Sequence, residues 1–79
     1  EITLEILRLC GERLRLAQKI AEIKATENLP IENLRVEDEL RKKVLGLCET
    51  YGVDRSFGAK ILELLLDESK RVQRDMLKS

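Results

Sequence analysis

The chain has 79 residues, which predicts one domain spanning residues 1–79 with a small core. Its 15 basic and 15 acidic side chains balance and only 3% of residues are aromatic, so we expect no nucleic-acid partner. A hydrophobic content of 43% argues against a disordered tail. Because the sequence shows no signal peptide and no long apolar run, we expect a cytoplasmic protein without a membrane partner.

The first expected helix runs from the N-terminus to about Glu27 and ends before Pro30, because a residue that precedes proline resists the helical conformation. It carries two adjacent apolar rows. The first row, called the seam below, consists of Ile2, Ile6, Leu9, Leu16, Ile20 and Ile23. The second row consists of Leu7, Cys10, Leu14, Ala17 and Ala21. The seam position between Leu9 and Leu16 holds a cation, Arg13.

Two further helices are expected at about 34–51 and 54–77, and no segment alternates like a strand, so the fold class is all-α with three helices. Asn33 and Asp54 are expected N-caps, and Gly52 is an expected left-handed C-cap. The first helix spans roughly 40 Å. Two shorter helices cannot cover both of its apolar rows, so we expect a homodimer in which the long helices pair.

The two cysteines, Cys10 and Cys48, both fall on apolar stripes, so we interpret them as reduced core thiols, with a disulfide as the alternative. The sequence contains no histidine and no glycine-rich phosphate loop. We therefore expect no metal site and no cofactor.

Five polar side chains interrupt the apolar stripes: Arg13, Lys24, Glu37, Ser69 and Gln73. Each alone has an ordinary explanation, such as a snorkelling cation or a carboxylate at a helix N-terminus. However, the first two project within about 20° of each other, and the last two share a helix face. If these faces meet, two buried cations confront one carboxylate, and the unbalanced charge favours a small polycarboxylate ligand.

The residue types also limit the chemistry of such a site. Without histidine, the site lacks the commonest general base and any partner that would activate a cysteine. What remains is a site that binds an anion, fixes its shape and stabilises developing negative charge. Those functions suffice for a unimolecular rearrangement, which requires neither a nucleophile nor a proton transfer.

Four segments occur in the order ERLRLAQKIAEIK, LPIENLRVEDEL, YGVD and LLLDESKRVQ. With this spacing, the chain from about Leu7 to Leu77 resembles the all-helical (AroQ-type) chorismate mutases. The resemblance implies an intertwined homodimer of three-helix chains that converts chorismate to prephenate on the route to phenylalanine and tyrosine. Such domains occur alone or fused to other enzymes of the pathway, and both arrangements fit this sequence.

The resemblance also implies roles for the five polar side chains that interrupt the stripes. Lys24 and Gln73 would donate hydrogen bonds to the ether oxygen of the substrate from opposite sides, and Lys24 would also help to hold a carboxylate. Arg13 and Ser69 would contact the substrate carboxylates. Glu37 would accept a hydrogen bond from the ring hydroxyl group.

Three departures from the family pattern accompany the resemblance. Asn33 stands where the family often has aspartate. Val36 replaces an arginine, and Arg35, one residue earlier, points about 100° away from that position. The arginine that binds the second carboxylate would lie before Glu1. We count Asn33, Arg35 and Val36 among the candidate substrate-binding residues. Two rival interpretations are a related lyase that releases pyruvate from isochorismate and a non-catalytic helical dimerisation or regulatory module.

Overall fold

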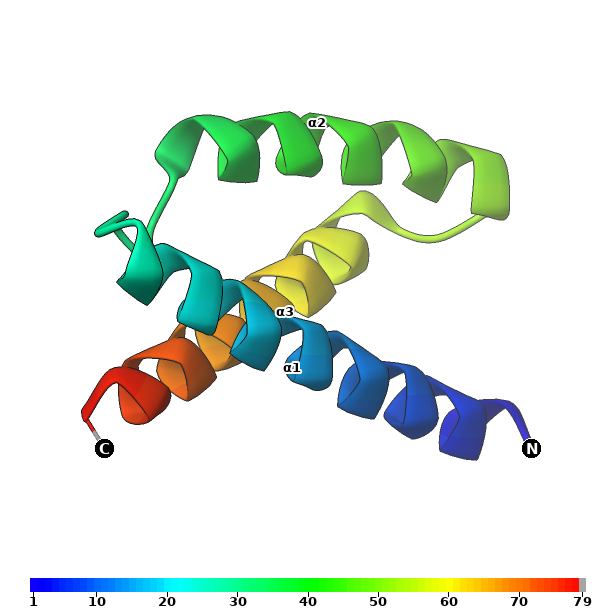
Figure 1. Ribbon diagram of the computed structural model, residues 1–79. Coiled ribbons are helices and arrows are strands. Elements are labelled where there is room, and N and C mark those ends of the chain that lie inside the picture. The colour runs from blue at the N-terminus through cyan, green and yellow to red at the C-terminus, as the bar shows by residue number, and fades with distance from the viewer. Residues whose placement is uncertain (79) are drawn as a thin grey trace. The chain divides into compact units, whose positions relative to one another are not determined.

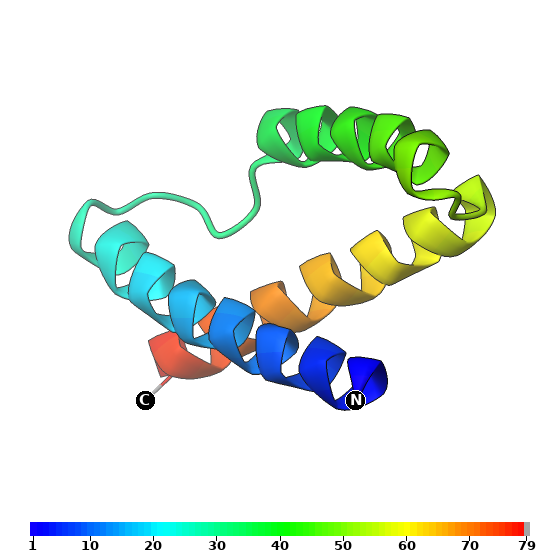
Figure 2. The ribbon, with the colours of Figure 1, turned by 90° about the vertical axis from the view of Figure 1, so that its right-hand side faces the viewer.

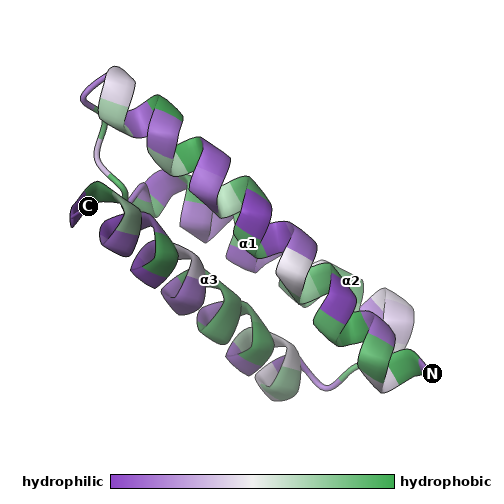
Figure 3. Cartoon of the chain, turned by 60° about the horizontal axis from the view of Figure 1, so that its bottom comes forward, coloured by the Kyte–Doolittle hydropathy of each residue, from purple (hydrophilic) through white to green (hydrophobic). Residues whose placement is uncertain are grey.

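The computed structural model describes residues 1–78, which form three α-helices and no strand, and this confirms the all-α expectation (Figure 1). Helix α1 spans Ile2–Thr26, α2 spans Leu34–Tyr51 and α3 spans Arg55–Lys78. Hydrophobic and hydrophilic residues are interspersed along each helix (Figure 3), as expected when apolar residues recur at the helical period. None of these helices combines the length and the apolar character needed to cross a bilayer.

The end of α1 is fixed by the residues that follow it. Asn28 adopts a left-handed conformation with φ 57°, which a short polar side chain tolerates better than most. The N–H of Leu29 then donates to the carbonyl oxygen of Lys24 over 2.7 Å. This bond satisfies one of the last carbonyl groups of the helix and closes it ahead of Pro30.

The three expected caps are confirmed. The Oδ1 atom of Asn33 accepts a hydrogen bond from the N–H of Val36 over 3.3 Å at the start of α2. Gly52 closes the same helix with φ 67°, a value that favours glycine. Asp54 accepts from the N–H of Phe57 over 3.0 Å at the start of α3.

The chain forms two compact units, and α3 contributes to both. Unit 1 consists of Glu1–Ile31 and the chain from Glu68 onward, so it pairs α1 with the second half of α3. Unit 2 is Glu32–Asp67, in which α2 and the first half of α3 form a helical hairpin (Figure 2). The buried apolar residues are Ala17, Ala21, Cys48, Leu62 and Leu66.

The two apolar rows of α1 differ in burial. Ala17 and Ala21 of the second row are buried, and Cys10 and Leu14 are half-buried. By contrast, every aliphatic residue of the seam is exposed, from 45% at Ile20 to 79% at Ile2. The chain therefore covers the second row with its own helices except at Leu7, which is 64% exposed, and leaves the large aliphatic side chains of the seam open.

Gly58 permits a close approach of α2 and α3 in unit 2. A Cβ atom at residue 58 would overlap the sulfur of Cys48, a buried and free thiol as the sequence predicted. We expect Gly58→Ala to lower the free energy of unfolding by about 1–3 kcal/mol, because the Cys48 side chain or the helices must shift to make room. Urea denaturation measures this cost. In a Cys48→Ala background the same substitution should cost less, and an equal cost in both backgrounds would exclude the thiol as the obstacle.

Candidate functional site

The eight candidate site residues divide equally between the two units. The four in unit 1 lie on α1 and on the second half of α3: Arg13, Lys24, Ser69 and Gln73. The four in unit 2 lie at the N-cap and in the first turn of α2: Asn33, Arg35, Val36 and Glu37.

Gln73 places an amide inside unit 1, where it is 5% exposed. Its Nε2 donates to Oγ of half-buried Ser69 over 3.2 Å, because a spacing of four residues brings the two side chains together on α3. The other amide atom, Oε1, is buried and accepts no hydrogen bond from the described residues. Leaving a buried amide oxygen unpaired costs free energy, so this atom marks a point where a bound molecule can complete the hydrogen bonding.

The two cations of unit 1, Arg13 and Lys24, are both half-buried on α1. The Nζ atom of Lys24 donates to the carbonyl oxygen of Ile31 over 2.6 Å, beyond the end of the helix. The ammonium is therefore held by the chain that follows α1. Because an ammonium carries three hydrogens, this bond does not exhaust its capacity to donate.

Glu37 is a buried carboxylate in the first turn of α2, with 7% of its surface exposed. Its Oε1 lies 3.6 Å from Nη2 of Arg41, one turn later on the same helix. Hydrogen bonds, first to Glu63 and then to Asp38, raise the pKa of Arg41, so the guanidinium stays positive. Arg41 was not predicted from the sequence, although its spacing of four residues from Glu37 is typical of a helical ion pair.

The other three candidates of unit 2 are exposed. Asn33 caps α2, and Val36, which follows in the first turn, is 54% exposed. The side chain of Arg35 is 89% exposed and its Nε lies 3.5 Å from Oε1 of Glu39. An exposed pair of this kind contributes little to stability. No group of acidic, cysteine or histidine side chains in residues 1–78 is arranged to hold a metal ion.

The sequence also matches the model of a known protein family. The model of the family "Chorismate mutase type II" matches residues 1–74. The chorismate mutase of Methanocaldococcus jannaschii is 35% identical over 77 residues, which cover 98% of this chain and 78% of that protein.

Two bifunctional relatives are also similar. The chorismate mutase/prephenate dehydratase of Aquifex aeolicus is 51% identical over 49 residues, 61% of this chain and 14% of that protein. The protein of the same name from Buchnera aphidicola is 29% identical over 74 residues, 94% of this chain and 19% of that protein. No solved structure matches at a significant level. The family match over 74 residues and the nearly full-length similarity to the M. jannaschii enzyme show that the chain belongs to the chorismate mutase type II family.

Proposed function

We propose that residues 1–79 form a single chorismate mutase domain that rearranges chorismate to prephenate by positioning and charge stabilisation. The observation that carries this proposal is the buried amide of Gln73, whose Oε1 accepts no hydrogen bond from residues 1–78. The family model matches residues 1–74, which include this amide. The product fits the two bifunctional relatives, whose names join the mutase to a prephenate dehydratase. A cytoplasmic location stays a prediction.

The rearrangement breaks the ether C–O bond of chorismate while a new C–C bond forms, so negative charge grows on the ether oxygen. Lys24 and Gln73 stabilise that charge by donating hydrogen bonds to this oxygen. A half-turn of the Gln73 amide lets Oε1 accept from the Ser69 hydroxyl group and moves Nε2 to the position that is now unsatisfied. Once the amide has turned, both donors are in place before charge develops on the ether oxygen, and this preorganisation contributes to the rate enhancement.

The remaining candidates hold the substrate in its reactive shape. Arg13 binds a carboxylate as a bidentate fork, and Ser69 contacts a carboxylate. Glu37, whose Oε1 lies 3.6 Å from Nη2 of Arg41, accepts a hydrogen bond from the ring hydroxyl group. Asn33, Arg35 and Val36 border the substrate at the start of α2. Holding the two reacting carbon atoms close together supplies part of the rate enhancement without any covalent step.

The test offers chorismate and isochorismate to the wild-type protein separately and identifies the products by chromatography. We expect prephenate from chorismate. Release of pyruvate from isochorismate without any prephenate would identify the related lyase instead. A folded protein that changes neither compound would favour the non-catalytic module.

A homodimer is the second part of the proposal, supported by the six exposed aliphatic residues of the seam on α1. Pairing of two long helices through this face, in the intertwined arrangement, removes it from water.

We expect Ile20→Asp to weaken the dimer by more than about a hundredfold, because both copies lose apolar burial and gain a charge. Sedimentation equilibrium measures the change. Lys19→Asp, one residue away, is the matched control and should leave the dimer intact, whereas a wild-type protein that stays monomeric would contradict the pairing.

A further inference from the structure

Arg41 is surrounded by three carboxylates within unit 2. Its Nε lies 2.7 Å from Oε1 of Glu63 and its Nη2 lies 3.4 Å from Oε2 of the same residue, a two-point contact that ties α2 to α3. Its Nη1 lies 2.8 Å from Oδ1 of Asp38. The third carboxylate is that of Glu37, whose Oε1 is 3.6 Å from Nη2. The guanidinium is therefore fixed from two sides before it faces Glu37.

Arg8 and Arg71 resemble Arg41 in that each pairs with more than one carboxylate, but their surroundings differ. Arg8 and Arg71 each contact two acidic residues on their own helix, and their side chains are 53% and 59% exposed. The side chain of Arg41 is 36% exposed, and that of its partner Glu37 only 9%. Arg41 thus connects two helices and also touches a buried residue of the candidate site.

At 3.6 Å the contact between Arg41 and Glu37 is an ion pair rather than a hydrogen bond. Its effect is electrostatic: it attracts one carboxylate oxygen, Oε1, and so restricts rotation of the carboxylate about its last torsion. Because Glu63 and Asp38 hold the guanidinium in place, the direction of this attraction is fixed by α2 and α3 together. A buried carboxylate without such a countercharge is costly.

We propose that Arg41 is a positioning residue, which holds Oε1 of Glu37 so that the other carboxylate oxygen is aimed at the hydroxyl group of the substrate. The inference rests on the proposed function, in which Glu37 accepts the hydrogen bond from that hydroxyl group. Arg41 itself touches no substrate. Its contribution to catalysis passes through Glu37, and the two residues therefore behave as one unit when they are mutated.

The test is a double-mutant cycle on kcat/KM for chorismate. We expect Arg41→Met to lower kcat/KM by about tenfold or more in the wild-type background. The same change should have less than about a twofold effect in a Glu37→Gln background, because the residue it positions has already been altered. Arg41→Lys retains a cation and should recover part of the loss. Arg71→Met, which also removes an arginine with two acidic partners, should leave kcat/KM unchanged.

A purely structural role for Arg41 makes different predictions. Glu63→Gln removes the charge that ties α2 to α3 but leaves Arg41 beside Glu37, with an amide oxygen that still accepts from the guanidinium. It should therefore lower the free energy of unfolding but cost less kcat/KM than Arg41→Met does. If Glu63→Gln lost as much kcat/KM as Arg41→Met, or if the effects of Arg41→Met and Glu37→Gln were additive, the positioning role would be overturned.

A wild-type protein that forms no prephenate would overturn both the proposed function and this inference. An active wild type with an equally active Arg41→Met variant would overturn this inference alone.

Discussion

Lys24→Ala should lower kcat for chorismate by about a hundredfold or more, because it removes a cationic donor from the oxygen on which charge develops. The initial rate of loss of chorismate absorbance measures kcat. The fold should survive, since the substitution removes one hydrogen bond, from Nζ to the Ile31 carbonyl group, worth about 1 kcal/mol. Circular dichroism during thermal unfolding verifies this.

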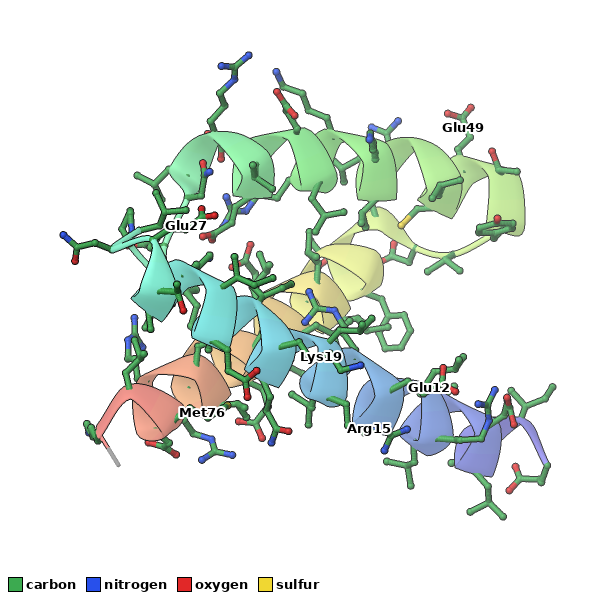
Figure 4. All side chains as sticks on the ribbon, in the orientation of Figure 1. Glu12, Arg15, Lys19, Glu27, Glu49 and Met76 are labelled. Carbon is green, nitrogen blue, oxygen red and sulfur yellow. The ribbon has the colours of Figure 1, made fainter. Side chains whose placement is uncertain are left out.

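Lys19→Ala is the matched control for that experiment. Lys19 is an exposed lysine on the same helix, near Glu12 and Arg15 on its charged side (Figure 4). We expect kcat to stay within about twofold of wild type, because an exposed charge away from the substrate contributes little. Equal losses in Lys19→Ala and Lys24→Ala would indicate a general effect of positive charge on α1 and would contradict the assigned role of Lys24.

Gln73→Glu should make turnover depend on pH. The wild-type amide donates a hydrogen bond at any ordinary pH, so residue 73 should cause little change in kcat between about pH 6 and 8. An ionised carboxylate at this position cannot donate and repels the growing charge, so kcat near pH 7 should fall about a hundredfold or more. The protonated carboxyl group can donate. Activity of Gln73→Glu should therefore rise as the pH falls through the pKa of the new carboxyl group, and fall as the pH rises through it.

The pH profile of kcat from pH 4.5 to 8 measures this effect. Gln73→Ala is the control: it should be as slow as Gln73→Glu at neutral pH but should not recover in acid, because it has no proton to gain. Parallel profiles for the two variants would contradict donation from residue 73 to the ether oxygen. A wild-type profile that rises steeply toward acid would contradict the role assigned to the amide.

The sequence predicted the elements because their ends depend on local chemistry. The Asn33 and Asp54 caps use side chains that accept N–H groups two or three residues ahead, and Gly52 supplies a positive φ, so each can be recognised without knowledge of the tertiary structure. Polar candidates were found in the same way, since a polar residue on an apolar stripe is visible from helical periodicity. Glu37 and Gln73, selected on that ground, are both buried.

Features that depend on packing between distant residues were not predictable in this way. Periodicity identified two apolar rows on α1, and their length indicated that the chain would not cover both, but it did not indicate that Ala17 and Ala21 would be the buried residues. The contact of Arg41 with Glu63 joins residues 22 positions apart, and the close approach of Gly58 to Cys48 depends on how two helices meet. Such contacts are set by the crossing of helices, which a single sequence does not specify.

The most direct test of the central claim is a calorimetric titration of the wild-type protein with a bicyclic dicarboxylate that mimics the transition state of the rearrangement. A site complementary to the transition state should bind this analogue at least about a hundredfold more tightly than chorismate, and Lys24→Ala should lose most of that preference while Lys19→Ala keeps it. A folded wild-type protein that does not bind the analogue, or that binds it no better than chorismate, would contradict catalysis by Lys24 and Gln73.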